Sequence, residues 1–157
     1  MATEDYDKPS KKAVRRAGET LRSPTASESE IDAAIAVLSQ WRACFYRPIN
    51  TFQALLRKKI KDEGFKNAIV AQRLKRTPSI VTKLERFPDM QLDRMQDIGG
   101  VRAVLNSVHE VRTIHNSLIK GRHKHSPVMP PKDYIAEPKQ DGYRGIHQVF
   151  KYSTSQH

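Results

Sequence analysis

Four polar residues between positions 73 and 83 have spacings that suit phosphate binding. Arg73 and Lys75 are two residues apart, so on a strand their side chains lie on one face. Ser79 and Lys83 are four residues apart and share one face of a helix. A helix beginning at Pro78 adds free backbone amides and the positive end of its dipole. The four side chains either surround one anion, such as a triphosphate, or form an ordinary solvated basic face.

A carboxylate stands nearby in the sequence, directly before a glycine pair. Asp97 precedes Gly99 and Gly100, whose missing side chains permit close approach of a ligand or of another strand. A carboxylate oxygen suits Mg²⁺, which prefers oxygen ligands and usually brings phosphates with it. A lone aspartate in a basic region is also a common helix cap or ion-pair partner. Asp97 therefore has two interpretations, and its local sequence does not choose between them.

Cations and aromatic residues are interleaved in a third segment, residues 132–147. The segment holds Lys132, Lys139, Tyr143 and His147. Aromatic rings among cations can stack on a nucleotide base while the cations neutralise phosphates. The alternative is structural, with tyrosines half-buried in a sheet and His147 bonded to a backbone group. Spacing alone leaves both interpretations open.

The first elements that must position these residues are helices. Apolar residues recur at three and four residue intervals from Ile31 to Cys44, which predicts an amphipathic helix beginning at Ser29 or Glu30. Pro48 interrupts this pattern, and Asn50 and Thr51 then offer caps for a second helix, which ends near Gly64. These two helices form a lead-in over residues 30–64.

The pattern of apolar and polar residues changes after Gly64. Alternation of the two kinds predicts a strand over residues 67–75. A helix with Thr77 as its N-cap follows, then a strand over 101–105 and a helix that stops around Gly121. Residues 133–135 and 146–152 look extended, with a mobile connection over 138–142. The order strand, helix, strand, helix indicates an α/β domain over residues 65–157.

The chain of 157 residues is long enough for one compact domain, so we expect a single folded unit. Residues 1–29 are polar and contain several lysines and arginines. They are expected to form a flexible basic arm with little fixed structure, or a short helix around residues 12–21.

Composition favours a cytoplasmic protein that meets anions. The chain has 28 Lys and Arg against 17 Asp and Glu, a net charge of +11, which attracts nucleotides, RNA or acidic membrane surfaces. Residues 65–157 contribute +8 of this charge. The single Cys44 fits a reducing compartment. No apolar run approaches the length of a membrane span, and the first residues do not resemble a secretory signal, so no membrane association is expected.

Three blocks occur in a fixed order, residues 73–83, 95–102 and 132–147, and together they resemble the synthetase domain of the RelA/SpoT family. The resemblance covers roughly residues 65–152. It implies an α/β (α+β) fold of the nucleotidyltransferase type, with a mixed sheet flanked by helices and an N-terminal helical lead-in. It also implies transfer of the β,γ-pyrophosphate of ATP to a 3'-hydroxyl of GDP or GTP, in guanosine tetraphosphate metabolism.

The resemblance further implies a role for each matching residue. Asp97 is the implied catalytic carboxylate and a ligand of Mg²⁺, while Tyr143 stacks on the acceptor base and His147 contacts an acceptor phosphate. Lys132 and Lys139 belong to a flexible acceptor loop. The implied cradle for the ATP phosphates consists of Arg73, Lys75, Ser79 and Lys83.

Two further expectations concern the kind of family member. The family domain continues with a strand that bears a second carboxylate, so we expect this domain to be incomplete at its C-terminus unless Glu137 or another chain substitutes. Residues 38–42 and 48–53 look like the lead-in of small stand-alone members, which are often homo-oligomers. Some of these are toxins with an antitoxin partner and modify the 3' end of tRNA. A non-catalytic remnant that binds nucleotides or RNA is the alternative from another class.

Overall fold

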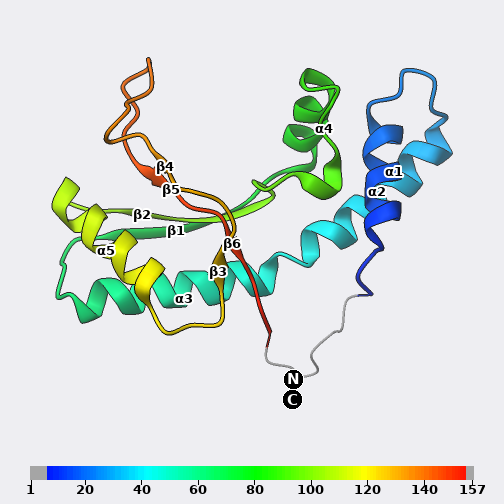
Figure 1. The fold of residues 1–157 in the computed structure, drawn as a ribbon. Helices are drawn as coiled ribbons and strands as arrows, with labels where there is room; N and C mark the ends of the chain where they lie inside the picture. The colour runs from blue at the N-terminus through cyan, green and yellow to red at the C-terminus, as the bar shows by residue number, and fades with distance from the viewer. Residues whose placement is uncertain (1–6, 155–157) are drawn as a thin grey trace. The chain divides into compact units, whose positions relative to one another are not determined.

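The computed structural model describes residues 7–154, which divide into two compact units (Figure 1). The first unit consists of the chain up to Asn50 together with Gln72–Val101. The second consists of Thr51–Ala71 together with the chain from Arg102 onward. Each unit buries apolar side chains of its own, among them Leu38 and Ile80 in the first and Leu56 and Ile114 in the second.

Three elements contribute residues to both units: helix α3 (Tyr46–Asp62) and strands β1 (Ile69–Leu74) and β2 (Gly99–Val104). The two strands pair with each other in a two-stranded sheet. These elements are therefore continuous across the division, and the domain boundary expected near residue 64 stays a prediction.

The first unit opens with two helices that lie side by side, α1 (Lys11–Leu21) and α2 (Glu28–Ala43) (Figure 1). Helix α1 begins where the Ser10 hydroxyl accepts a hydrogen bond from the Ala13 amide. Helix α2 begins with a capping box, in which Ser27 and Glu30 satisfy each other's backbone amides. The predicted start at Ser29 or Glu30 is thus one to two residues late, because the helix begins directly after its cap and before the apolar pattern.

Residues 11–21 are not a flexible arm but a packed helix, so the alternative of a short helix there is the one that the structure has. Val14 is fully buried, and Arg15 binds the side chain of Asp93 through two nitrogen–oxygen contacts of 2.9 and 3.3 Å. Gly18 lies so close to Leu92 that a Cβ added there would be 2.7 Å from the Leu92 Cβ. The polar composition concealed this helix because only one narrow stripe of it is apolar.

The core of the first unit gathers side chains from α1, α2, α4 (Thr77–Arg86), the short 3-10 helix η1 (Leu92–Arg94) and the approach to β2. Its buried members are Val14, Leu38, Trp41, Ile80, Leu84, Leu92, Met95 and Ile98. Arg22, just after α1, donates hydrogen bonds to the carbonyls of Pro88 and Met90 at 2.7 and 2.9 Å. The helices of the first unit therefore pack on the same core as the residues that lead into β2.

Helix α3 begins earlier than its sequence suggests. Pro48 lies in its first turn, where a missing N–H costs nothing because the first amides of a helix have no acceptor within it. Asn50 and Thr51 are consequently inside the helix and are not its caps. The helix ends at Asp62, near Gly64 as expected; Gly64 has a φ of +70° and donates its amide to the Lys61 carbonyl.

Helix α4 follows β1 directly, as the sequence predicts. Its N-cap is Arg76 rather than Thr77, and Arg76 makes no side-chain cap hydrogen bond. Thr77 and Pro78 are the first two helical residues, which suits the fixed φ of proline. Ile80 and Leu84 point into the core, so the opposite side of α4 is left for polar residues.

The second unit adds α5 (Val108–Lys120) and two short antiparallel ladders to the end of α3. Strands β3 (Ser126–Pro127) and β6 (Phe150–Lys151) form one ladder, and β4 (Lys132–Asp133) and β5 (Ile146–His147) form the other. The extended segments predicted near residues 133 and 146 are therefore present, as paired two-residue strands. The expected mixed sheet is represented in residues 7–154 by three separate strand pairs.

Among the helices of residues 7–154, none combines the length and the apolar character that crossing a bilayer would require.

Candidate active site

The first cluster of chemical groups lies where β1, α4 and β2 meet in the first unit. Lys83 donates a hydrogen bond to Asp97, with 2.8 Å between Nζ and Oδ1. Lys75 approaches the other oxygen, with 3.4 Å between Nζ and Oδ2. We call Lys75, Lys83 and Asp97 the lysine–aspartate cluster. Two ammonium groups on one carboxylate leave a net positive charge at this point.

Backbone contacts hold this cluster in place. The Lys75 amide donates to the Ile98 carbonyl at 2.7 Å, which aligns the end of β1 with the approach to β2. Arg42 of α2 donates from Nε to the Lys75 carbonyl at 2.8 Å. Gly99 permits a close approach, because a Cβ there would be 2.8 Å from the Ile49 Cδ1. The glycine pair predicted a close approach at this point, but no feature of the sequence predicted the contact from Arg42.

Asp97 stays ionised across the physiological range. Partial burial opposes its charge, but the hydrogen bond and the positive charge of Lys83, together with those of Lys75, outweigh that effect and lower the pKa of Asp97 below its usual value. Its side chain is 50% exposed, so a ligand can reach the carboxylate. The structure shows Asp97 as an ion-pair partner, and its role as a ligand of Mg²⁺ stays a prediction. Within residues 7–154 no three His, Cys, Asp or Glu side chains converge as a metal site.

The other two residues of the predicted cradle lie on the neighbouring elements. Arg73 is exposed on β1, and Ser79 is half-buried on α4, one turn before Lys83. Among the described residues, neither is bonded to the lysine–aspartate cluster. Ion pairs thus connect three of the predicted residues. Arg73 and Ser79 lie on the adjoining strand and helix of the same unit.

A second cluster lies in the second unit, around the β4–β5 hairpin. The Tyr143 hydroxyl is 2.8 Å from His147 Nε2, and the Lys139 ammonium lies over the Tyr143 ring at 5.3 Å from its centroid. The same ammonium is 4.6 Å from the centroid of the Tyr134 ring, which meets His147 edge to face at 5.1 Å. We call Tyr134, Lys139, Tyr143 and His147 the aromatic–cation cluster. Lys132 faces His147 in the strand register.

The loop between β4 and β5 has internal hydrogen bonds, and the mobility expected for residues 138–142 stays a prediction. The Tyr134 amide donates to the Gly145 carbonyl at 2.8 Å, and the Gly142 amide to the Lys139 carbonyl at 2.9 Å. Gly142 has a φ of +81°, a conformation that glycine adopts without strain. These bonds bring Lys139 and Tyr143 onto the same side of the loop.

His147 is held in its neutral form at pH 7. Partial burial lowers its pKa, and the positive charges of Lys139, Arg102 and Lys132 lower the pKa further. A neutral imidazole whose Nε2 is unprotonated can accept the Tyr143 hydroxyl proton in a hydrogen bond. The sequence suggested a backbone partner for His147 as one alternative, whereas the structure gives it a tyrosine hydroxyl.

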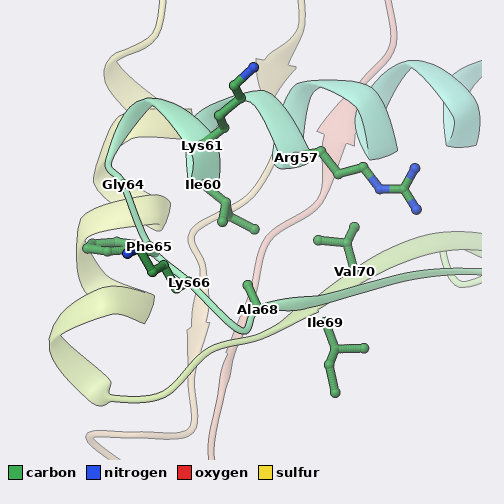
Figure 2. A pocket seen from close by; sticks show the side chains of 9 residues that line it. All are labelled: Arg57, Ile60, Lys61, Gly64, Phe65, Lys66, Ala68, Ile69 and Val70. Carbon is green, nitrogen blue, oxygen red and sulfur yellow. The ribbon is translucent and has the colours of Figure 1, made fainter.

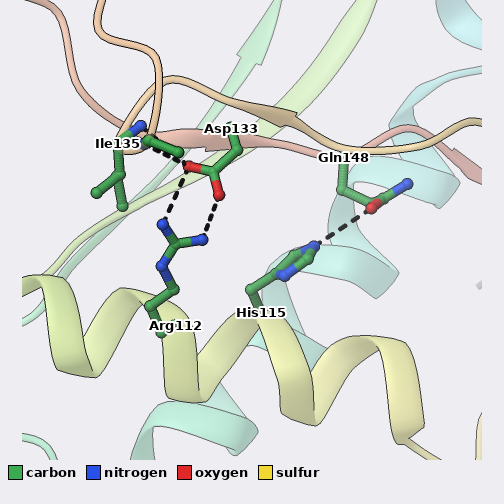
Figure 3. A network of polar contacts seen from close by, with 6 residues as sticks. Arg112, His115, Asp133, Ile135 and Gln148 are labelled. Atoms are coloured by element: carbon green, nitrogen blue, oxygen red, sulfur yellow. Dashed lines mark hydrogen bonds and ion pairs between the residues drawn. The ribbon is translucent and has the colours of Figure 1, made fainter.

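An ion pair from α5 supports this hairpin, as Figure 3 shows. The Arg112 guanidinium donates to both carboxylate oxygens of Asp133, and one of these oxygens also accepts from the amides of Ile135 and Ala136. The hydrogen bond from Arg112 and those two amides lower the pKa of Asp133. Sequence reasoning missed Arg112, because its partner is 21 residues away.

The sequence pattern described as the region found in RelA / SpoT proteins matches residues 72–157. This chain belongs to the RelA/SpoT family. The match includes both clusters, so all nine predicted site residues lie inside the family region. The resemblance seen in the sequence is confirmed, and the roles of the individual residues stay predictions.

Two RelA/SpoT relatives come from Bacillus subtilis (strain 168). The GTP pyrophosphokinase YjbM is 35% identical over 85 residues, covering 53% of this chain and 39% of its own length. The GTP pyrophosphokinase YwaC is 32% identical over 85 residues, covering 50% of this chain and 39% of its own length. The matched region thus spans about two fifths of the length of these curated relatives.

A solved RelA/SpoT-type structure has a similar fold. It is the small alarmone synthetase 1 of Bacillus subtilis bound to its product pppGpp, with a TM-score of 0.57 and 22% sequence identity. The alignment covers 71% of this chain and 70% of that one. At this identity the likeness establishes the fold, so the expected α/β class with helices around short strands is confirmed.

An open groove lies elsewhere in the second unit of this RelA/SpoT chain, between the end of α3 and the start of β1 (Figure 2). Its volume is about 640 Å³, and its lining includes apolar Ile60 and Val70 as well as basic Arg57, Lys61 and Lys66. None of the nine predicted site residues lines this groove. The candidate site is therefore defined by the two side-chain clusters and not by this hollow.

Proposed function

We propose that this chain is an ATP-dependent pyrophosphokinase that transfers the β,γ-pyrophosphate of ATP to the 3'-hydroxyl of GDP or GTP. The observation that carries the proposal is the lysine–aspartate cluster inside the family region, with Lys83 and Lys75 at 2.8 and 3.4 Å from the Asp97 carboxylate. The names of the two curated relatives support the same reaction.

The ATP side of the reaction rests on Lys75 and Lys83. Their ammonium groups are already held at one point by Asp97, and a triphosphate brings more negative charge than one carboxylate can offer. Arg73 adds a third cation from β1, and Ser79 a hydroxyl from α4. The first turn of α4 contributes free backbone amides, because Arg76 supplies no side-chain cap there.

Mg²⁺ is the proposed cofactor, and Asp97 is the residue that would hold it. The carboxylate is half-exposed and ionised, and Mg²⁺ is commonly bound by one or two carboxylates together with substrate phosphates. Bound there, Mg²⁺ would offset charge on the transferring phosphates. Phosphates bound to Lys75 and Lys83 would leave the Asp97 oxygens available to hold Mg²⁺.

The acceptor side rests on the aromatic–cation cluster. Tyr143 offers a ring for stacking on the acceptor base, and Lys139 and Lys132 offer charge for its phosphates. His147, neutral and hydrogen-bonded to Tyr143, contacts an acceptor phosphate as a donor through its other nitrogen. The acceptor 3'-oxygen then bonds to the β-phosphorus of ATP while the bond to the α,β-bridging oxygen breaks. AMP leaves with the electron pair of the broken P–O bond, and the proton of the hydroxyl passes to solvent.

A second acceptor, the 3' end of tRNA, also suits the net charge of +11, which attracts a guanine nucleotide as well. Such a toxin-type member would have an antitoxin partner. Both acceptors place the reaction in the cytoplasm, where ATP, guanine nucleotides and tRNA occur together. A homo-oligomer remains a prediction from the family resemblance.

One labelling experiment tests the proposal and chooses the acceptor. The purified chain is incubated with Mg²⁺ and ATP labelled at the γ-phosphate, with GDP, GTP or deacylated tRNA added separately. We expect label on GDP and GTP, with AMP released in equal amount. Label on tRNA alone would replace the guanosine acceptor by the toxin-type reaction.

A matched pair of variants ties the result to the site. Lys83→Gln removes one cation of the lysine–aspartate cluster and is expected to abolish most of the transfer. Lys12→Gln makes the same change on the exposed side of α1 and is expected to leave transfer unchanged. Folded protein that binds ATP but labels no acceptor would overturn the proposal in favour of a non-catalytic binding protein.

A further inference from the structure

Asp133 is a point of convergence in the second unit. Four donors reach its carboxylate: two guanidinium nitrogens of Arg112, one of them 3.3 Å from Oδ1, and the amides of Ile135 and Ala136, at 3.1 and 3.0 Å from the same oxygen (Figure 3). A carboxylate with this many partners has one orientation. It also fixes the direction in which the chain leaves strand β4.

The residues next to Asp133 belong to the proposed acceptor site. Lys132 precedes it, and Tyr134, which packs against His147 and under the Lys139 ammonium, follows it. In the ladder, Asp133 faces Ile146 and Lys132 faces His147. A rotation of the chain at Asp133 would therefore move members of the aromatic–cation cluster on both strands of the hairpin.

The exposure of the ion pair indicates that it does more for orientation than for stability. The side chains of Arg112 and Asp133 are 40% and 30% exposed. Solvent-exposed ion pairs contribute little to folding because water screens them and ordering both side chains costs entropy. A two-pronged guanidinium contact nevertheless restricts geometry strongly. The pair is thus suited to hold a loop in one position on a helix that is already folded.

We propose that Arg112 is a positioning residue for acceptor binding, acting by clamping Asp133 so that Tyr134, Lys139 and Tyr143 face the acceptor together. This inference rests on the proposed pyrophosphokinase function and deepens it. Arg112 lies on α5, outside the aromatic–cation cluster, and its ion pair with Asp133 connects it to that cluster. The clamp therefore governs affinity for the acceptor and leaves the ATP side, in the other unit, unaffected.

Three variants separate the contributions of charge and of contact geometry to the clamp between Arg112 and Asp133. Arg112→Met removes the guanidinium and keeps most of the apolar stem. Arg112→Lys keeps the charge and loses the two-pronged contact. Asp133→Asn keeps an oxygen for the Ile135 and Ala136 amides and loses the charge that binds Arg112. Arg122→Met, an exposed arginine two residues beyond the end of α5, is the matched control.

We expect Arg112→Met and Asp133→Asn to raise the KM for the guanine nucleotide about tenfold, the scale of loss that a small misplacement of binding groups produces, with little change in the KM for ATP. Arg112→Lys is expected to rescue only part of this loss, because one ammonium cannot make both contacts. The double variant should be no worse than the poorer single variant, since both changes break the same contact. Arg122→Met should match the wild type.

A second measurement does not depend on turnover. NMR titration of His147 should give a higher pKa in Arg112→Met than in the wild type, because a displaced loop carries Lys139 and Lys132 away and exposes the imidazole. A wild-type chain that transfers no pyrophosphate would refute the proposed function, and this titration would then decide the clamp separately. An unchanged His147 pKa, or equal rises in KM for both substrates, would overturn the clamp.

Discussion

Lys83 of α4 and Asp97, just before β2, form the shorter ion pair of the lysine–aspartate cluster, with 2.8 Å between Nζ and Oδ1. Lys75 takes the other oxygen at 3.4 Å, so one carboxylate holds two cations in place before any phosphate arrives. Asp97 has two roles in the proposed reaction. It forms ion pairs with the two lysines in the free protein, and it would hold Mg²⁺ in the complex with ATP.

The first prediction concerns Asp97→Asn, which removes the charge and keeps the shape of the side chain. We expect magnesium-dependent transfer to fall by about 100-fold, as side chains that support a metal commonly cost 10 to 100-fold when changed. ATP binding without Mg²⁺ should persist, since Lys75 and Lys83 stay. Initial rates over a Mg²⁺ titration provide the measurement.

The matched control is Asp89→Asn, another exposed aspartate of the first unit. Its magnesium dependence should equal that of the wild type. Undiminished turnover in Asp97→Asn would remove Asp97 from the proposed metal site.

The stacking role proposed for Tyr143 predicts a difference between the two substrates. Tyr143→Ala should weaken acceptor binding by about 1 to 3 kcal/mol, the range for loss of one base–aromatic stack, and leave ATP binding nearly unchanged. Tyr143→Phe keeps the ring and loses only the hydroxyl that bonds His147, so it should retain most of the affinity.

Calorimetric titrations with GDP and with a non-hydrolysable ATP analogue measure both affinities. Tyr46→Ala, which removes a tyrosine that is 55% exposed at the start of α3, is the control. Equal losses for both nucleotides in Tyr143→Ala would contradict the stacking role.

The His147 imidazole should titrate below its ordinary pKa of 6.5. As pH falls below 6.5 the unfolded chain binds a proton before the folded chain does, so the folded state loses stability until the pH passes its own lower pKa. Lys139→Gln should raise the His147 pKa, because it removes the positive charge that lowers this pKa most. NMR titration tests this, with Lys151→Gln as a control that should leave the midpoint in place.

Gly18 provides a test of how α1 packs. Alanine at this helical position should gain about 1 kcal/mol from helix propensity alone. A Cβ there would, however, lie 2.7 Å from the Leu92 Cβ, and forced overpacking costs about 1 to 3 kcal/mol. We therefore expect Gly18→Ala to lower the free energy of unfolding.

Urea denaturation measures the difference. Gly100→Ala is the matched control, because a Cβ at Gly100 meets nothing within 4 Å. A stabilised Gly18→Ala protein would mean that α1 does not pack tightly on η1.

The order of elements and the family could be predicted from the sequence, because both depend on the spacing of residue types within short segments. Apolar intervals placed α2 and α5, alternation placed β1 and β2, and three ordered blocks carried the RelA/SpoT resemblance. Intervals of two residues on a strand and of four residues on a helix also predicted that Lys75 and Lys83 lie on faces of these elements that could surround one anion. These features depend on the periods of helix and strand, which are properties of short segments.

Tertiary structure alone decided which side chains meet. The polar segment around Arg15 is a packed helix that buries Val14 and pairs Arg15 with Asp93, 78 residues away. Asp97 became a partner of two lysines, and Arg112 became the support of Asp133. Such contacts join residues far apart in the chain, and no local periodicity records them, because the free energy that selects them arises only when separate elements pack together.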